Sequence, residues 1–192
     1  PVQMSYERAM ANQLIKGPGD YGDALRALPP KLLSLMVSAF QSHLFNRALS
    51  RRVDEGIPLA EPIVGDRLLF HDGREDIVTT RNMRAALMQV RRGRCQVAIF
   101  IPGSGEVAAH GRMDEIMQEL MQEEGISAQD FKRASQFVEM KYEGTLRPIA
   151  IFADVRPEVM GDNVRLEFTL PPGHYATTVC REYMKAEPYV MI

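Results

Sequence analysis

The sequence has few of the features that mark membrane proteins, secreted proteins or metalloproteins. Only two of its 192 residues are cysteines, Cys95 and Cys180, and both have apolar neighbours. Two such thiols offer neither a disulfide framework nor metal-ligand spacing. The longest apolar runs, such as residues 97–101, are far too short to cross a bilayer, and no basic and then apolar leader opens the chain. We therefore expect a soluble protein of the cytoplasm.

Catalytic signatures are also scarce. The four histidines show no metal-binding spacing, and no G-x-S-x-G nucleophile elbow occurs. Gly103-Ser104-Gly105 looks like a fragment of a phosphate-binding loop, but it lacks the Gly-Lys-Ser/Thr ending, which favours a plain turn. Asp66 follows a turn glycine, so we expect its carboxylate to bond the backbone. The residues alone predict no cofactor, no metal and no catalytic constellation.

The formal net charge of −2 argues against a nucleic-acid partner, but the charge is unevenly distributed. No acidic residue occurs between Ile77 and Gly105, and an acidic block follows at residues 114–130. The basic window contains Arg81, Arg84, Arg91, Arg92 and Arg94. These arginines either form a solvated helix face or bind phosphate, to which the guanidinium fork is suited. Charge patterning alone leaves both interpretations open.

Periodicity predicts a mixed α and β unit over residues 29–143. Apolar residues at spacings of three and four predict a long helix over residues 33–53, after shorter helices at 6–16 and 23–28. Further helices are expected at 83–92 and 113–124, and Ser127 with Asp130 forms a capping box for one more. Short strands are expected at 62–70 and 76–80, and a buried strand at 95–101.

The pattern changes near residue 144. Residues 147–155 read as a strand, 157–162 as a connection, and 164–170 as a half-buried alternating strand. A Pro-Pro-Gly turn then leads to an amphipathic helix, whose first backbone N–H groups would favour an anion such as phosphate. Two strands and one helix cannot form a useful core alone, so we expect their partner strands in a missing segment or in another chain.

Two segments resemble one known family. Residues 168–185 are similar to the closing motif of the TruD family of tRNA pseudouridine synthases, which runs F-x-L-P-x-G-x-Y-A-T-x-x-x-R-E. Residues 39–46 resemble the family's A-x-Q-S-x-L-F-N helix, and Leu28-Pro29 precedes it as in the family. Val64-Gly65-Asp66 and residues 101–105 fall in the family's order, so the resemblance spans most of the chain.

This resemblance implies an α+β fold with three parts. Residues 1–28 would be a helical lead-in from the catalytic domain, 29–143 the insertion domain, and 144–192 the C-terminal part of a catalytic domain with an antiparallel sheet. The implied reaction isomerises a specific uridine of tRNA, at position 13, to pseudouridine without a cofactor. A base must leave its stack to be reached, and the pocket that receives it needs apolar and aromatic walls.

One departure from the family pattern is severe. The family carries its essential aspartate in a Gly-x-Lys-Asp segment and an aromatic that contacts the uridine in a Gln-Arg-Phe-Gly segment, both upstream of the insertion. Neither segment occurs here, and the chain has no Lys-Asp dipeptide. We therefore expect no catalytic residue in this chain. The partners implied are tRNA and the N-terminal half of the catalytic domain.

The resemblance also implies which residues form the functional site. It implies a uridine pocket formed by Phe168, Leu170, Gly173, Tyr175, Ala176, Thr177 and Arg181. Core packing of Phe168 and Leu170 and a turn at Gly173 are equally compatible with the pattern, and Arg181 with Glu182 could be a structural pair. The candidate RNA-binding residues are Gln41, Ser42, Asn46, Arg51, Arg52, Arg81, Arg84, Arg91, Arg92 and Arg94. For the first three, structural hydrogen bonds are the stronger interpretation.

The sequence therefore leaves three functions open. The first is part of a tRNA pseudouridine synthase that is inactive as this chain alone. The second is a non-catalytic RNA-binding module derived from such an enzyme, and the third is a protein-interaction domain without an RNA role. The upstream sequence and the salt dependence of tRNA binding would distinguish them.

Overall fold

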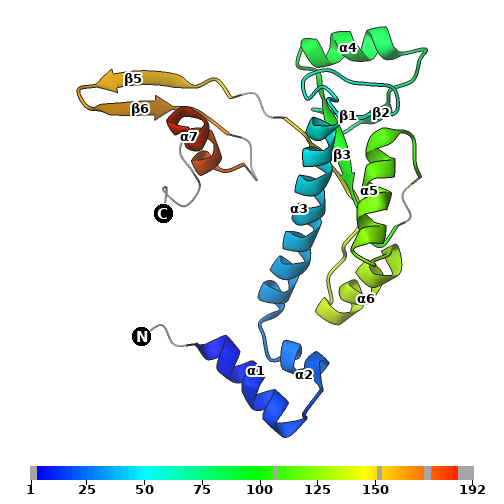
Figure 1. The fold of residues 1–192 in the computed structure, drawn as a ribbon, viewed down its shortest axis with the longest axis vertical. Coiled ribbons are helices and arrows are strands. Elements are labelled where there is room, and N and C mark those ends of the chain that lie inside the picture. Colours follow the sequence, from blue (N-terminus) through cyan, green and yellow to red (C-terminus); the bar gives the residue numbers. More distant parts are fainter. Residues whose placement is uncertain (1–3, 106–107, 151–152, 171–173, 186–192) are drawn as a thin grey trace. The chain divides into compact units, whose positions relative to one another are not determined.

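The computed structural model describes residues 4–105, 108–150, 153–170 and 174–185. The chain divides into two compact units, residues 1–150 and 151–192 (Figure 1), which are described separately below. Across the described residues no helix combines the length and the apolar character needed to cross a membrane.

The first unit begins with two short helices that were predicted. α1 (Ser5–Lys16) ends at Gly17, and α2 (Tyr21–Arg26) starts at Asp20, whose carboxylate accepts a hydrogen bond from the Asp23 backbone N–H at 3.0 Å. That bond satisfies one of the N–H groups left free at a helix start. Most of α1 is exposed, and its Met10 packs at the edge of the core of the unit.

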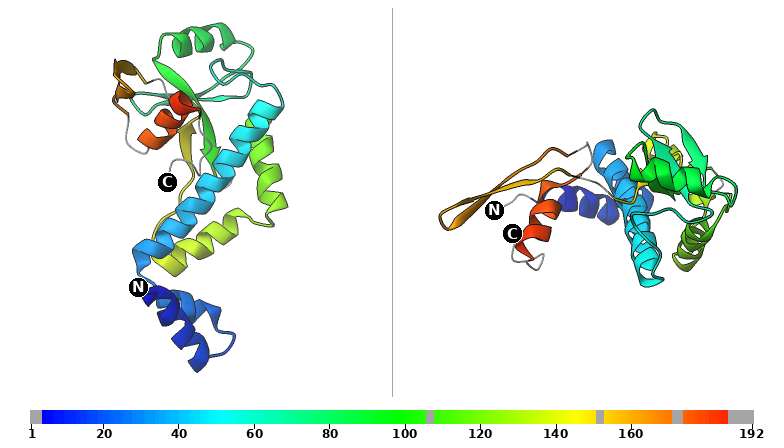
Figure 2. Two further views of the ribbon diagram at one scale, coloured as in Figure 1. Left: turned by 60° about the vertical axis from the view of Figure 1, so that its left-hand side comes forward. Right: turned by 90° about the horizontal axis from the view of Figure 1, so that it is seen from above.

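The long predicted helix is α3 (Pro30–Asp54), 25 residues in length. Pro30 suits its first turn, where a missing N–H costs nothing. Leu33, Leu44 and Ala48 form its buried stripe, as the spacing predicted. α3 runs beside α5 (Arg112–Glu123), and the two helices are in contact (Figures 1 and 2).

A four-stranded antiparallel sheet forms the centre of this unit. Its strands are β1 (Arg67–Phe70), β2 (Glu75–Ile77), β3 (Cys95–Ile101) and β4 (Thr145–Pro148), in the order β2-β1-β3-β4. The strand predicted at residues 95–101 is confirmed as β3. It pairs on both sides and packs against α3, α4 and α5, so most of its side chains are buried.

Two further helices complete the first unit. α4 (Met83–Arg91) lies at the end of the unit opposite α1 and α2 (Figure 1). α6 (Ala128–Val138) starts with the predicted capping box, in which the Asp130 carboxylate accepts from the Ser127 backbone N–H at 2.9 Å. These bonds lower the pKa of Asp130, because the Ser127 hydroxyl and backbone N–H both stabilise its charged form.

β4 corrects one sequence-based expectation. The strand expected at residues 147–155 covers Thr145–Pro148, and its partner is present, because Arg147 lies opposite Ile99 of β3. Gly144 makes this return possible. A Cβ there would meet the Phe100 ring at 2.0 Å, so any larger residue would displace that ring, under which the chain passes. The compact units divide at residues 150/151, whereas the predicted domain boundary lay at 143/144.

The described residues of the second unit form a hairpin and one helix. β5 (Arg156–Met160) pairs with β6 (Asn163–Glu167), and α7 (Ala176–Met184) follows. The connection expected over residues 157–162 was wrong. Most of it is β5, and only Gly161, at φ +63°, and Asp162 form the turn. Gly-Asp between two short strands is a known signal of a hairpin.

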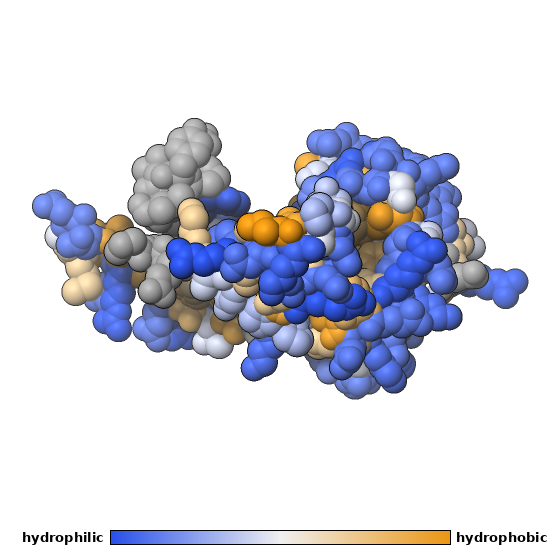
Figure 3. Space-filling view, turned by 90° about the horizontal axis from the view of Figure 1, so that it is seen from below, coloured by the Kyte–Doolittle hydropathy of each residue, from blue (hydrophilic) through white to orange (hydrophobic). Residues whose placement is uncertain are grey.

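The second unit has almost no core of its own. None of the described residues from 153 onwards is buried, and along the strand expected at 164–170 only Leu166, Phe168 and Leu170 are half-buried, in the expected alternation with exposed positions. Val159 is 77% exposed and Val164 61%, which is unusual for valines in strands. The face in Figure 3 is mainly hydrophilic, with small apolar patches.

Candidate nucleic-acid interface

Arginines of α3 bind glutamates of α5 along the contact between the two helices. Arg51 pairs with Glu119 at 3.0 Å and with Glu123 at 2.5 Å, and Arg47 pairs with Glu123 at 2.8 Å and also with Glu124. Arg47 and Arg51 are four positions apart and lie on one face of α3. Glu119 and Glu123 are likewise four positions apart and lie on one face of α5. The acidic block therefore neutralises part of the basic side chains of α3.

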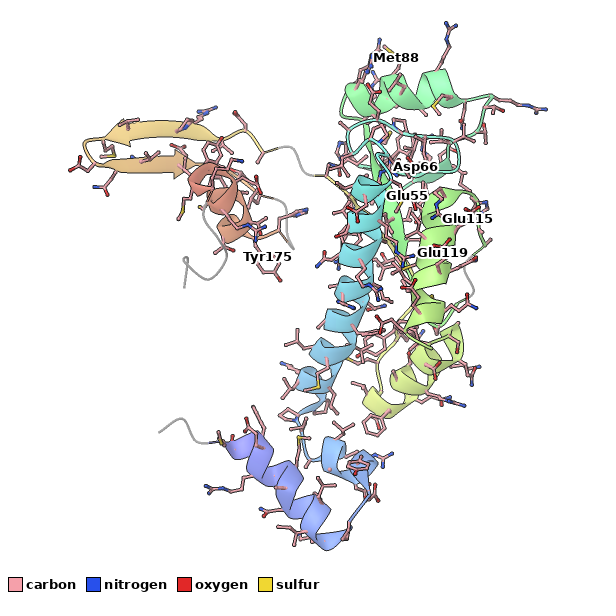
Figure 4. The ribbon with its side chains drawn as sticks, in the orientation of Figure 1. Glu55, Asp66, Met88, Glu115, Glu119 and Tyr175 are labelled. Atoms are coloured by element: carbon pink, nitrogen blue, oxygen red, sulfur yellow. The ribbon has the colours of Figure 1, made fainter. Side chains whose placement is uncertain are left out.

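Arg112, at the start of α5, extends this ion-pair network. It pairs with Glu55 at 2.5 Å and with Glu119 at 2.7 Å. Figure 4 labels the two glutamates. The hydrogen bond from Arg112 lowers the pKa of Glu55, and the hydrogen bond from Arg51 lowers the pKa of Glu123. Arg51 was a candidate for RNA binding, but two carboxylates already occupy its guanidinium.

Arg52 is a clear correction to the candidate list. Its side chain is fully buried, and its guanidinium donates to both carboxylate oxygens of Asp66 at 2.8 Å. It also donates to the backbone carbonyl of Pro58 at 2.7 Å. Asp66 accepts a further bond from the Ile63 N–H at 2.8 Å, as expected for a residue at a turn. Arg52 therefore cannot reach RNA, and its charge is neutralised inside the protein by Asp66.

Two of the three polar candidates on α3 make structural hydrogen bonds. The Gln41 amide donates to the carbonyl oxygen of Pro102 at 2.9 Å, which ties α3 to the turn after β3. The Ser42 hydroxyl donates to the Ser38 carbonyl at 2.9 Å and accepts from Arg147 at 3.3 Å. Structural hydrogen bonds were the preferred interpretation for these side chains, and both Gln41 and Ser42 form them. Asn46 is exposed on the surface of α3.

The arginines around α4 remain available to a partner. We call Arg81, Arg84, Arg91, Arg92 and Arg94 the α4 arginines. All five are exposed. Arg91 pairs with Glu61 at 2.6 Å, whereas the other four form no ion pair with a described residue. Because α4 and its flanking residues carry no acidic side chain, the four guanidinium groups without an ion pair have no acidic neighbour close in sequence.

A pocket beside α4 was not anticipated from the sequence. It holds about 320 Å³ and lies between the β1–β2 turn and the C-terminal end of α4. Its walls are Phe70, His71, Asp72, Arg74, Gln89 and Arg94. The Asp72-Gly73 turn was visible in the sequence, but nothing there indicated that this turn and the C-terminal end of α4 lie side by side. Only Arg94 of these six residues was a candidate.

The predicted uridine-pocket residues belong to the second unit. Tyr175 is the N-cap of α7 and is 73% exposed, and Ala176 and Thr177 form the first turn of that helix. Phe168 and Leu170 follow β6 and are half-buried. Gly173 lies outside the described residues. Phe168 also lines a small cavity of about 230 Å³ with Asp154, Arg156, Glu167 and Thr169.

The suggested pair between Arg181 and Glu182 does not form among the described residues. Glu182 instead pairs with Lys185 at 3.2 Å, one turn further along α7. Arg181 is half-buried on α7.

Within the described ranges, no three His, Cys, Asp or Glu side chains come together to hold a metal ion. Burial raises the pKa of the Cys95 thiol, so this group stays protonated.

Comparisons with known proteins agree on one family. The family model described as tRNA pseudouridine synthase D (TruD) matches residues 1–183. The chain is 34% identical to a "Probable tRNA pseudouridine synthase D" of Methanosarcina acetivorans, covering 100% of the chain and 46% of the relative. It is 36% identical to a protein with the same name from Natronomonas pharaonis, covering 98% of the chain and 44% of the relative.

A solved structure gives the same answer for the fold. The chain superimposes on a crystal structure described as tRNA pseudouridine synthase D (TruD) from Methanosarcina mazei with a TM-score of 0.83 and 33% identity. The match covers 98% of the chain and 46% of that structure, so the chain spans about half the length of the relatives it matches. The resemblance seen in the sequence is confirmed, and the chain belongs to the TruD family of tRNA pseudouridine synthases.

Proposed function

We propose that this chain is part of a tRNA pseudouridine synthase, which isomerises a specific uridine of tRNA to pseudouridine. The family match over residues 1–183 carries the proposal. The essential aspartate would lie in a part of the protein that this chain does not include, because no Lys-Asp dipeptide occurs in it. The finer assignment, to the uridine at position 13, rests on the family resemblance alone.

The α4 arginines support tRNA as the partner. Four of them lack an ion pair with a described residue, and guanidinium groups suit phosphate because one fork binds two oxygens. Phosphate contacts carry no sequence information, so this surface would position the tRNA while other residues select the uridine. Arg52 is excluded from this surface, and Arg51 is held by Glu119 and Glu123. A tRNA substrate would also place the protein in the cytoplasm.

The second unit supports a further partner, the remaining part of the catalytic domain. Its hairpin exposes Val159, Met160 and Val164, and α7 exposes Tyr183 and Met184. Strands with exposed apolar side chains and unpaired edges are normally covered by other strands or helices. We propose that additional strands of the same protein extend the β5–β6 hairpin into a larger antiparallel sheet, with the start of α7 facing the uridine.

Release of tritium from tRNA that carries [5-³H]uridine tests the activity. The full-length protein should release it, since the C5 hydrogen is lost when the base is rejoined through that carbon, and the 192-residue chain alone should not. A full-length variant with its Lys-Asp aspartate changed to asparagine is the matched control and should be inactive. Release by the isolated chain, or none by the full-length protein, would contradict the proposal.

Binding of tRNA to the chain separates the proposal from the two alternatives. Several arginine–phosphate contacts demand a steep loss of affinity as salt rises, because binding releases condensed counterions. A steep salt dependence together with an inactive full-length protein would favour a non-catalytic RNA-binding module. Absent or salt-independent binding would favour a protein-interaction domain.

A further inference from the structure

The pocket beside α4, lined by Phe70, His71, Asp72, Arg74, Gln89 and Arg94, combines features that suit one nucleotide. We call it the Phe70 pocket. Its volume of about 320 Å³ falls at the lower end of the roughly 300–1,000 Å³ range of small-molecule sites. It lies in the first unit, so it is built without any residue of the predicted uridine pocket.

One wall of the Phe70 pocket offers a stacking surface. The guanidinium of Arg74 lies over the Phe70 ring, 4.1 Å from the ring centre. The β1–β2 turn fixes this arrangement, because the Phe70 N–H donates to the Arg74 carbonyl at 2.9 Å and the Arg74 N–H donates to Asp72 at 3.0 Å. Aromatic rings and guanidinium planes are the surfaces on which unstacked bases of RNA are held.

Another wall of the pocket contains Gln89, which has an unused acceptor. Its side-chain Oε1 is buried and has no hydrogen-bond partner among the described residues. A buried acceptor left without a donor is costly, and such groups call for an explanation. A donor on the edge of a base, such as an amino or imino N–H, would complement it after a small rotation of the amide.

The end of α4 brings a cation to the same wall. Gly93, at φ +64°, turns the chain sharply, and the Arg94 N–H donates to the Gln89 carbonyl at 3.0 Å. This places Arg94 beside Gln89, where it has no ion pair with a described residue. The Gly93 carbonyl also accepts from His71 Nε2 at 2.6 Å, which leaves the Nδ1 of a neutral His71 as an acceptor.

Charge favours a phosphorylated ligand. Arg74 and Arg94 outnumber the single carboxylate of the pocket, Asp72, which lies 3.9 Å from Arg74. Arg91 and Arg92 precede the pocket on the same chain segment and are exposed. A nucleotide whose base stacks on Phe70 and Arg74 could therefore place its phosphate near Arg94, with the neighbouring phosphates of the strand along the α4 arginines.

We infer that the Phe70 pocket binds one unstacked nucleotide of the RNA substrate other than the uridine that is isomerised. The choice of RNA rests on the proposed function. The role of the pocket is to fix the position of the RNA on the first unit, since a captured base sets the register of a strand that phosphate contacts alone leave free to slide.

Titration of the full 192-residue chain with uridine and adenosine 5′-monophosphates, followed by NMR of its backbone amides, tests the inference directly. Shifts should centre on residues 70–74, 89 and 93–94. The corresponding nucleosides should bind more weakly, and inorganic phosphate alone should shift Arg94 without shifting Phe70. Shifts confined to other residues, or no binding by either monophosphate, would overturn the inference.

Gln89→Met gives the sharpest variant, because methionine keeps the length of the side chain and removes the unused acceptor. The variant should be as stable as the parent or more so, yet bind the monophosphates about fivefold more weakly, as for one lost hydrogen bond. Gln129→Met, at an exposed position of α6, is the matched control and should change neither property. Unchanged affinity in Gln89→Met would overturn the assignment.

Binding of tRNA to the same chains separates this inference from the proposed function. Phe70→Leu and Arg94→Ala should each weaken tRNA binding about tenfold, the size expected when one stacked base or one charge-assisted contact is lost. An inactive full-length protein whose Phe70 pocket still binds nucleotides would refute the synthase proposal alone. An active protein whose activity and tRNA affinity survive both substitutions would refute only the pocket.

Discussion

Arg52 of α3 and Asp66, in the turn before β1, form a two-pronged ion pair that is completely shielded from water, with both N–O distances at 2.8 Å. Burying two charges is expensive, and here two further N–H groups of the guanidinium bind the Pro58 carbonyl while Asp66 also accepts from Ile63. The pair holds the loop after α3 against the start of the sheet.

Asp66→Ala should therefore be strongly destabilising, because it leaves the Arg52 charge buried without a partner. We expect a loss of about 3–5 kcal/mol in the unfolding free energy of the first unit. Asp154→Ala removes one partner of an exposed pair in the second unit and should cost less than about 0.5 kcal/mol. Urea titrations followed by circular dichroism compare them. Equal effects would show that burial of the Arg52–Asp66 pair is unimportant.

Gly65 and Gly111 bring two backbones together, which yields a second prediction. A Cβ on Gly65 would lie 2.5 Å from the Gly111 Cα, and Gly65 also has φ +91°. Gly65→Ala combines a backbone clash with a strained conformation and should cost about 2–4 kcal/mol. Gly105→Ala, where a Cβ meets nothing within 4 Å, is the control and should leave the melting temperature nearly unchanged. A tolerated Gly65→Ala would mean that the two loops can separate.

Much of the first unit could be predicted because its elements depend on local patterns. The stripe of α3, the apolar run of β3 and the capping box of α6 each involve residues close in sequence. The pairing of β4 with β3 could not be predicted in this way. It joins residues about 50 positions apart in the chain, and it depends on Gly144 passing under the Phe100 ring.

The candidate site was harder to predict, because composition does not show which arginines are already occupied. Arg51 and Arg52 adjoin in sequence, yet successive positions on a helix point about 100° apart. One therefore meets the glutamates of α5, and the other enters the core and binds Asp66. The spacing of four residues in Arg47 and Arg51, matched in Glu119 and Glu123, could have indicated the ion-pair network.

Acid should weaken the contact between α3 and α5. The pKa values of Glu55 and Glu123 are lowered in the folded chain, chiefly by hydrogen bonds from Arg112 and Arg51. A carboxylate with a lowered pKa contributes stability above its unfolded pKa and loses it as the pH falls through the folded value. Thermal stability should thus be level near neutral pH and fall progressively below the ordinary glutamate value of 4.5.

Glu123→Gln isolates one part of that acid dependence. The variant cannot titrate at this position, so it should be less stable than the parent at pH 7 and should lose less stability on acidification. Glu139→Gln, at an exposed position after α6, is the matched control and should reproduce the parent curve. Melting temperatures between pH 7 and pH 3 test this. Parallel curves for parent and Glu123→Gln would contradict a role for the α3–α5 pairs in the acid response.

The α4 arginines make the sharpest prediction about RNA. Each arginine that contacts a phosphate adds roughly 0.7–0.9 to the slope of log affinity against log salt, because binding releases the counterions of that phosphate. Arg84→Ala and Arg92→Ala should each lower the slope for tRNA by about that amount, and the double variant by about twice as much. Arg47→Ala is the control, since Glu123 and Glu124 already occupy that guanidinium. A slope that drops as far for Arg47→Ala as for Arg84→Ala would place the tRNA backbone along α3 and not along α4.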